Sequence, residues 1–228
     1  MMGQLKRFIL SILNYIRHKK SYSQDGEDVA LLGFYEGVKH YKGFYVDIGA
    51  HHPVRFSNTH LFYKLGWRGI NIDPTPGSMK AFRFWRLRDI NLEIGIGAQN
   101  DTLKFFCFND PALNTFDAQV AQQRNTGKPY KVIREVEIPI RPLIDVLIEH
   151  LPKGQVIDFI SIDVEGLDLE VLQSNDWQKW SPKFVLVEDH EFQIEQLEKS
   201  KIYVFLKSQG YRISAVLKRT IIYQKIVN

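Results

Sequence analysis

The stretch that decides the fold is Gly43-Phe44-Tyr45-Val46-Asp47-Ile48-Gly49-Ala50-His51-His52-Pro53. Its apolar run from Phe44 to Ile48 predicts a buried strand, and a helical pattern begins near Asn58. A glycine between strand and helix permits a positive φ angle and lets a ligand approach bare backbone. Open α/β sheets place their ligand crevice at the carboxyl ends of such strands. We therefore expect a nucleotide-like ligand beside Gly49, with Asp47 nearby.

Strand and helix patterns alternate along the rest of the chain. Strands are expected at 44–48, 67–73, 90–94, 156–162 and 184–187, and helices at 58–65, 77–86, 143–150, 167–173 and 191–208. This alternation predicts a mostly parallel sheet in an α/β fold, with helices on both faces. Segments 211–216 and 220–227 predict a C-terminal antiparallel hairpin at one edge.

A long polar segment, 109–131, separates two further extended segments at 103–108 and 132–138. Loops of this length in compact domains are usually functional or disordered. We expect this one to close over a bound acceptor, as active-site lids do.

Composition limits the class of protein. The 228 residues fit one domain with a short appendage. The single cysteine, Cys107, excludes an internal disulfide and fits a reducing compartment, so we expect a cytoplasmic protein. The net charge of +4 is modest and no zinc-finger or RNP-type spacing occurs, which argues against nucleic acid as a partner.

Residues 1–20 form the appendage, which leaves 21–228 as the main domain. Within residues 1–20, six apolar residues recur at helical spacing and are flanked by basic residues. The six are Leu5, Phe8, Ile9, Ile12, Leu13 and Ile16. The apolar run is too short for a membrane span, and a signal-peptide cleavage site is missing. We favour a helix that packs on its own domain or on a second subunit, as in a homodimer. Contact of residues 5–20 with an anionic membrane surface is the alternative.

Asp73 supports the expectation of a nucleotide-like ligand, because it lies at the end of the second expected strand. A carboxylate there can accept both ribose hydroxyls of a nucleoside. An NAD enzyme places an acid similarly, but its pyrophosphate needs more glycine than Ile48 to His52 supplies. S-adenosylmethionine (SAM) has no phosphate, so one glycine suffices. We interpret the turn as a SAM site, with His51 touching donor or acceptor, and keep a nucleotide-sugar- or NAD-binding enzyme as the alternative.

An acidic group is expected at the same crevice. Asp163 and Glu165 follow the strand at 156–162, and Glu188, Asp189 and His190 follow the next strand. Asp163, Glu188 or His190 can serve as general base for an acceptor hydroxyl. Alternatively, Asp163, Glu188 and Asp189 can hold a divalent cation such as Mg²⁺ that orients a sugar diol. If these side chains face away from the crevice, a non-catalytic, membrane-peripheral scaffold remains.

Three further side chains are candidates for the acceptor. Arg55 follows the glycine turn and can bind an anionic group. Asn58 lies at the next helix start, where it could equally serve as N-cap. Asn114 lies in the 109–131 segment, where acceptor specificity can reside.

Five motifs in order resemble the FkbM family of SAM-dependent methyltransferases. They are Ser21-Tyr22-Ser23-Gln24-Asp25-Gly26-Glu27-Asp28, Tyr45-Val46-Asp47-Ile48-Gly49-Ala50, Ser57-Asn58-Thr59, Gly66-Trp67-Arg68-Gly69-Ile70-Asn71-Ile72-Asp73-Pro74 and Ile160-Ser161-Ile162-Asp163-Val164-Glu165-Gly166. The resemblance implies a Rossmann-like class I methyltransferase fold with a seven-stranded sheet. It also implies O-methylation of a hydroxyl, often on a sugar or a polyketide-derived product.

The same resemblance assigns roles to residues of these motifs. Asp47, Gly49 and Asp73 are expected to contact SAM, and Asp163 and Glu165 to line the reaction site. The first motif is expected to form a wall over the donor, which adds Gln24. Ala50 and Pro74 are expected as further donor contacts because they adjoin Gly49 and Asp73.

Overall fold

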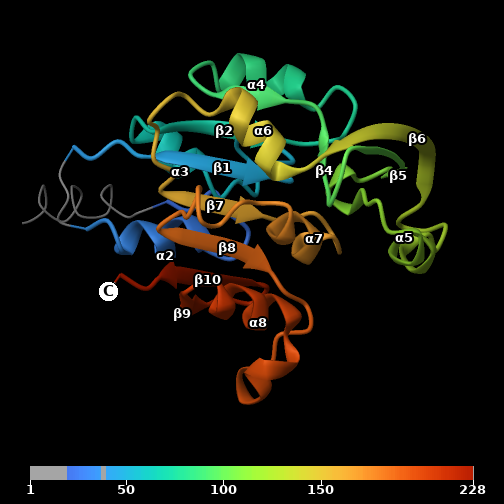
Figure 1. Cartoon of the computed structure of the whole chain (residues 1–228). Coiled ribbons are helices and arrows are strands. Elements are labelled where there is room, and N and C mark those ends of the chain that lie inside the picture. The colour runs from blue at the N-terminus through green and yellow to red at the C-terminus, as the bar shows by residue number, and fades with distance from the viewer. Residues whose placement is uncertain (1–19, 37–39, 228) are drawn as a thin grey trace, which may run out of the picture.

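The computed structural model describes residues 20–36 and 40–227 (Figure 1). The predicted N-terminal helix therefore lies outside the described residues, except for Lys20. Within the described part of the chain, no helix is long and apolar enough to cross a bilayer.

The main sheet has seven strands in the order β3-β2-β1-β7-β8-β10-β9. Their bounds are β1 Phe44–Ile48, β2 Arg68–Ile72, β3 Ile90–Leu92, β7 Phe159–Ile162, β8 Phe184–Glu188, β9 Tyr211–Val216 and β10 Thr220–Lys225. The first five strands of that order run parallel, and β10 runs antiparallel to both β8 and β9. The predicted α/β fold with a C-terminal antiparallel hairpin is confirmed.

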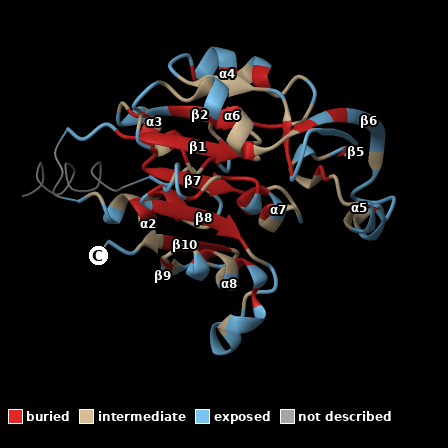
Figure 2. Cartoon of the chain, viewed as in Figure 1, coloured by how far each residue is buried: buried red, intermediate tan, exposed pale blue. Residues whose placement is uncertain are grey.

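Helices cover both faces of this sheet. They are α2 Glu27–Gly33, α3 His60–Lys64, α4 Met79–Trp85, α6 Leu143–His150, α7 Asp168–Gln173 and α8 Lys201–Ser208, whereas α5 Ala118–Arg124 lies apart, near the small sheet described below (Figure 1). Successive side chains of a strand point to opposite faces. Val46 of β1 therefore packs with residues of α6, α7 and α8, whereas Tyr45 packs with Leu31 of α2 and Phe62 of α3. Figure 2 shows that the strands between these layers are buried.

A second, three-stranded sheet lies beyond the carboxyl ends of the main strands (Figure 1). It consists of β4 Gly95–Ile96, β5 Asp101–Phe108 and β6 Val132–Arg141, in the order β4-β6-β5. The expected strand 90–94 is too long, because β3 ends at Leu92 and the chain then pairs with β6. The extended segments 103–108 and 132–138 are confirmed as the antiparallel pair β5 and β6.

The polar segment 109–131 is more ordered than predicted. It contains a 3₁₀ helix, η1 Pro111–Leu113, and the helix α5. Asp117 begins α5 as its N-cap, because its Oδ1 accepts hydrogen bonds from the amides of Gln119 at 2.7 Å and Val120 at 3.0 Å. The segment therefore has its own helical structure between β5 and β6.

The prediction of one continuous helix over 191–208 is wrong. The chain instead forms a 3₁₀ helix, η2 Ile194–Lys199, and then α8. Ser200 separates them with extended backbone angles, φ −71° and ψ 116°. Its hydroxyl oxygen accepts from the amide of Tyr203 at 2.9 Å and its hydroxyl hydrogen is donated to Asp189. This N-cap starts a new helix where the apolar pattern alone indicates no break.

Candidate active site

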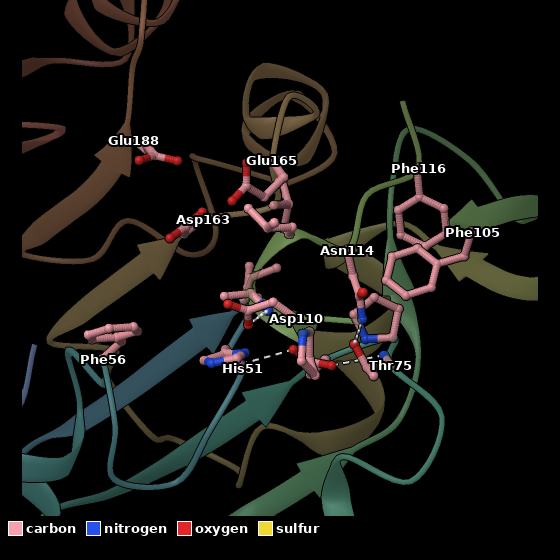
Figure 3. Close-up of a pocket in the computed structure, with 18 of the residues that line it drawn as sticks. His51, Phe56, Thr75, Phe105, Asp110, Asn114, Phe116, Asp163, Glu165 and Glu188 are labelled. Atoms are coloured by element: carbon pink, nitrogen blue, oxygen red, sulfur yellow. Dashed lines mark hydrogen bonds between the residues drawn. The ribbon is translucent and has the colours of Figure 1, made fainter. Parts of the chain in front are cut away.

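A cavity of about 430 Å³ lies where the carboxyl ends of β1, β2, β7 and β8 meet the small sheet (Figure 3). This volume is within the range of small-molecule sites. It is lined by most of the predicted site residues, namely Gln24, Gly49, His51, Arg55, Asp73, Pro74, Asn114, Asp163, Glu165, Glu188 and His190. Strand ends far apart in sequence therefore meet around one hollow, as the sheet topology predicts.

The turn after β1 brings two strand ends close together at the edge of the cavity. Gly49 has a φ angle of 80°, and a Cβ atom built on it would lie 1.7 Å from the backbone oxygen of Asp163. Only glycine therefore permits this contact between the ends of β1 and β7. The amides of Gly49 and Ala50 both donate to the carbonyl of Ile72, at 2.9 and 3.0 Å, which fixes the turn against β2.

Asp73 lies beside this turn with both carboxylate oxygens held. Oδ2 accepts a hydrogen bond from the amide of His51 at 2.9 Å, and Oδ1 accepts one from the amide of Thr75 at 2.8 Å. A carboxylate oxygen has two lone pairs, so each oxygen can still accept a ligand hydroxyl. The Nε2 atom of His51 is buried without a hydrogen-bond partner among the described residues, and burial lowers the pKa of this imidazole. These groups fit a nucleoside diol.

One end of the cavity is apolar. Phe105 and Phe116 pack with ring centroids 4.5 Å apart and lie opposite the strand ends in Figure 3. Asn114 sits at this end, where its Nδ2 donates to Thr75 Oγ1 at 3.1 Å. Its Oδ1 accepts from the amide of Phe108 at 2.8 Å. The two phenylalanines were not predicted from the sequence, because the β5–β6 pairing positions Phe105, and Phe116 follows an isolated bridge between Phe106 and Thr115. Since the amide of Thr75 donates to Asp73, the bond to Thr75 places Asn114 near Asp73.

The other end is acidic. Asp163 is exposed to the cavity, and Glu188 beside it is only 8% exposed. Enclosure by protein atoms, followed by the charge of Glu188, raises the pKa of Asp163 well above its usual range. Burial also raises the pKa of Glu188, against the opposing effect of His190, whose Nε2 lies 3.3 Å from Glu188 Oε2. Because the pKa of each carboxyl group is raised and the two groups interact, the pair holds one proton between them more readily than two isolated carboxyl groups would.

Glu165 faces the cavity from the turn after β7, but it already has a partner. Its Oε2 lies 2.6 Å from Nη2 of Arg124 in α5, and its carbonyl accepts from Thr115 Oγ1 at 3.0 Å. These contacts attach the 109–131 segment to the rim of the cavity. Glu165 is thus placed to position this segment.

Backbone strain is concentrated around the same cavity. His51, Phe56 and Glu165 have φ angles of 50°, 56° and 56°, and all three line it. Non-glycine residues rarely adopt positive φ, and such strain tends to occur at functional sites. Phe56 was not predicted from the sequence. Phe56 is 39% exposed, and the guanidinium of Arg55 lies 4.2 Å from the centroid of its ring.

Four predicted site residues do not line the cavity. Asp47 shares the sheet face of Tyr45, is buried, and its Oδ2 accepts from Thr59 Oγ1 at 2.7 Å. Ala50 is buried with Met79 and Phe82.

The other two, Asn58 and Asp189, are bonded elsewhere. Asn58 donates from Nδ2 to Ser161 Oγ at 3.0 Å. Asp189 accepts from Ser200 and from the amide of Glu191. The trio expected for a divalent cation is therefore not brought together. Among the described residues, the ligand atoms of Glu165, Glu188 and His190 do lie within 4.8 Å of one another.

Comparison with known proteins gives a match to a sequence family and a match to a solved structure. The sequence model of the Methyltransferase FkbM domain matches residues 47–213, which include Asp73, Asp163 and Glu188. A solved structure, the methyltransferase FkbM from Methylobacillus flagellatus KT, superposes with a TM-score of 0.50 and 13% identity. The match covers 89% of this chain and 48% of that chain, so the chain spans about half the length of that protein. At this identity the likeness concerns the fold alone. A search of curated protein sequences gives no match.

Proposed function

The chain belongs to the FkbM methyltransferase family, and from this premise we propose that it transfers a methyl group from SAM to a hydroxyl of a sugar, glycan precursor or related small molecule. One observation carries the proposal. A single cavity joins the Gly49 turn and Asp73 to the carboxyl groups of Asp163 and Glu188. A donor bound beside Asp73 and an acceptor bound beside the carboxyl groups would therefore lie next to each other in the same cavity.

The donor is proposed to lie along the floor of the cavity. Asp73 would accept the ribose hydroxyls with the lone pairs that His51 and Thr75 leave available. The apolar end near Phe105 would enclose the adenine ring, and the methionine part would pass Gly49 toward Asp163. This direction places the cationic sulfur near the acidic end, where Coulomb attraction favours it.

The acidic end is proposed to hold and deprotonate the acceptor. SAM supplies an electrophilic methyl carbon, so that an O–C bond forms as the C–S bond breaks and S-adenosylhomocysteine results. Asp163 and Glu188 would bind the acceptor hydroxyl, and the ionised member of the pair would take its proton. Arg55 and Phe56 would contact the acceptor at the rim.

We prefer this carboxylate pair to a divalent cation as the activating group. Asp189 bonds to Ser200, so the expected ligand set is incomplete, and Glu165 pairs with Arg124. On this proposal the methyltransferase retains its activity in EDTA. Loss of activity in EDTA that Mg²⁺ restores would instead assign Glu165, Glu188 and His190 to a metal.

The decisive experiment for the donor is a calorimetric titration with SAM, S-adenosylhomocysteine, NAD and a UDP-sugar in parallel. We expect SAM and S-adenosylhomocysteine to bind and the two nucleotides to bind much more weakly. Tighter binding of NAD or the UDP-sugar would reject the proposal, because either result assigns the cavity to another class of enzyme. No heat with any of the four ligands would also count against it.

A further inference from the structure

Segment 84–89, which runs from the end of α4 into the following turn, buries charged side chains and exposes apolar ones. Arg86 and Asp89 point inward, both side chains are 0% exposed, and Nε of the arginine lies 2.9 Å from Oδ2 of the aspartate. Phe84 and Trp85, at the end of α4, and Leu87, in the turn, point outward with exposures of 72%, 57% and 77%. Charged side chains are rarely buried, and large apolar ones are usually covered. This arrangement requires a reason beyond the stability of the fold.

A buried network anchors the turn firmly. Arg86 donates to the carbonyl of Pro53 at 2.9 Å and to the hydroxyl of Tyr45 at 3.0 Å. Asp89 accepts from the amide of Gly69 at 3.0 Å. Breaking a buried pair of this kind is strongly destabilising, so the turn is held in place. Phe84, Trp85 and Leu87, which we call the α4 patch, are therefore presented on a rigid base.

The rim of the α4 patch is positively charged. Lys80 precedes Phe84 by one helical turn, and Arg83 and Arg88 flank the patch in sequence; all three are exposed. Arg88 also lies over the ring of Tyr63, at 3.9 Å from its centroid. The sequence from 74 to 88 contains no Asp or Glu. The patch thus combines three exposed apolar groups with exposed cations and no acid from its own segment.

This charge decides between possible occupants. A second copy in a two-fold contact would bring two basic rims together, and like charges repel. Residues 1–20 of this chain carry basic residues and no acid, so their charge does not complement the patch either. An anionic lipid surface does complement it. Aromatic rings favour the bilayer interface, an aliphatic side chain reaches the acyl region, and Lys and Arg meet the headgroups.

We propose that the α4 patch docks the protein onto an anionic membrane surface, independently of residues 1–20. Phe84, Trp85 and Leu87 insert into the interface, and Lys80, Arg83 and Arg88 contact acidic headgroups. The fold then presents its α4 side to the bilayer (Figure 1), while the cavity lies at the carboxyl ends of the strands.

The test is co-sedimentation of the full chain with phosphatidylcholine vesicles, with and without phosphatidylserine. We expect binding only to the phosphatidylserine vesicles, and weaker binding as salt screens the charges. The triple variant Phe84→Ser, Trp85→Ser, Leu87→Ser should lower the partition coefficient by about tenfold or more, because the inserted apolar groups are lost. A second variant, Lys80→Gln with Arg83→Gln, should reduce the preference for phosphatidylserine.

A matched control separates insertion from a general loss of surface apolarity. Ile133, Ile148 and Val156 have exposures of 61%, 60% and 61% and lie outside α4. Changing these three residues to Ser should leave vesicle binding unchanged. Equal binding of the wild type to both kinds of vesicle, no binding at all, or full binding by the α4 triple variant would overturn the proposal. A wild-type dimer that the α4 variant converts to monomer, without vesicle binding, would assign the patch to self-association instead.

Discussion

Nη2 of Arg124 lies 2.6 Å from Oε2 of Glu165, and this ion pair fastens α5 to the turn after β7. The two side chains are 27% and 20% exposed, so water screens the pair only in part. Because Glu165 also lines the cavity, the pair links the position of the 109–131 segment to the shape of the site.

Arg124→Gln should therefore loosen the segment. We expect faster proteolytic cleavage between residues 125 and 131, and a fall in kcat/KM of about tenfold, with most of the change in KM, since residues of the segment line the cavity that we propose to bind donor and acceptor. Limited proteolysis and steady-state kinetics measure the two effects.

The matched control is Arg141→Gln. Arg141 pairs with Glu149 at 2.8 Å and has a similar exposure of 30%, but it does not line the cavity. This variant should keep the wild-type cleavage rate and kinetics. Equal effects of both substitutions would show that the Arg124–Glu165 ion pair has no specific effect on the cleavage rate or on kcat/KM.

Asp73→Ala should weaken binding of S-adenosylhomocysteine by about tenfold to a hundredfold, the expected effect of losing one or two hydrogen bonds to a charged acceptor. Asp73→Asn should give a smaller loss because one carbonyl acceptor remains. Isothermal titration calorimetry measures both. Asp189→Asn is the control, since Asp189 also follows a strand but bonds to Ser200 outside the cavity. Unchanged affinity in Asp73→Ala would reject its role at the ribose.

Most of the cavity could be predicted because strand ends in an open α/β sheet converge whatever the intervening chain does. Asp73, Asp163 and Glu188 each end or follow a strand, and all three line the cavity. Asp47 does not, although its motif is intact. It precedes the end of β1 by one residue, so the two-residue period of a strand turns its side chain toward Thr59.

Other features depend on contacts that no local pattern specifies. Phe105 reaches the cavity only because β5 pairs with β6, and this pairing spans the whole 109–131 segment. The apolar spacing predicts helix through Ser200, yet its hydroxyl caps α8 and bonds to Asp189. The outward position of Phe84 follows from the burial of Arg86, which the sequence shows only as one arginine in a basic cluster.

Glu188→Gln and Asp163→Asn should each lower kcat by about 10²–10⁴-fold while leaving affinity for S-adenosylhomocysteine nearly unchanged, because a general base acts in the transition state. In the wild type, kcat should rise with pH as the first of the two protons leaves the pair, because the ionised member that acts as the base then forms; burial raises the pKa of both carboxyl groups and so moves this rise to higher pH. Each variant should lose this step.

Glu165→Gln is the informative comparison for that pair. An amide can still accept a hydrogen bond from Arg124, so we expect a much smaller fall in kcat than for Glu188→Gln. Equal losses in both variants, or an unchanged rate in Glu188→Gln, would contradict the assignment of the base to Asp163 and Glu188.

Asp47 provides a prediction about stability rather than rate. Burial raises its pKa to about 6, above the value of 3.8 for an exposed Asp. A group whose pKa is raised on folding contributes stability that is complete below the unfolded pKa and is lost as pH rises through the folded pKa. The free energy of unfolding should therefore fall between about pH 4 and pH 6 through this group, by on the order of 3 kcal/mol.

Asp47→Asn should abolish this part of the pH dependence, because an amide does not ionise and its Oδ1 can still accept from Thr59. Urea unfolding of wild type and variant at several pH values measures the difference between them. His60 acts in the opposite direction, since its pKa is lowered to about 4 and its contribution is lost as pH falls; it is common to both proteins and cancels in that difference. An exposed acid on β5 gives the control, Asp101→Asn, which should follow the wild-type curve. If the two variants showed the same pH dependence, Asp47 would not be the buried acid that titrates in this range.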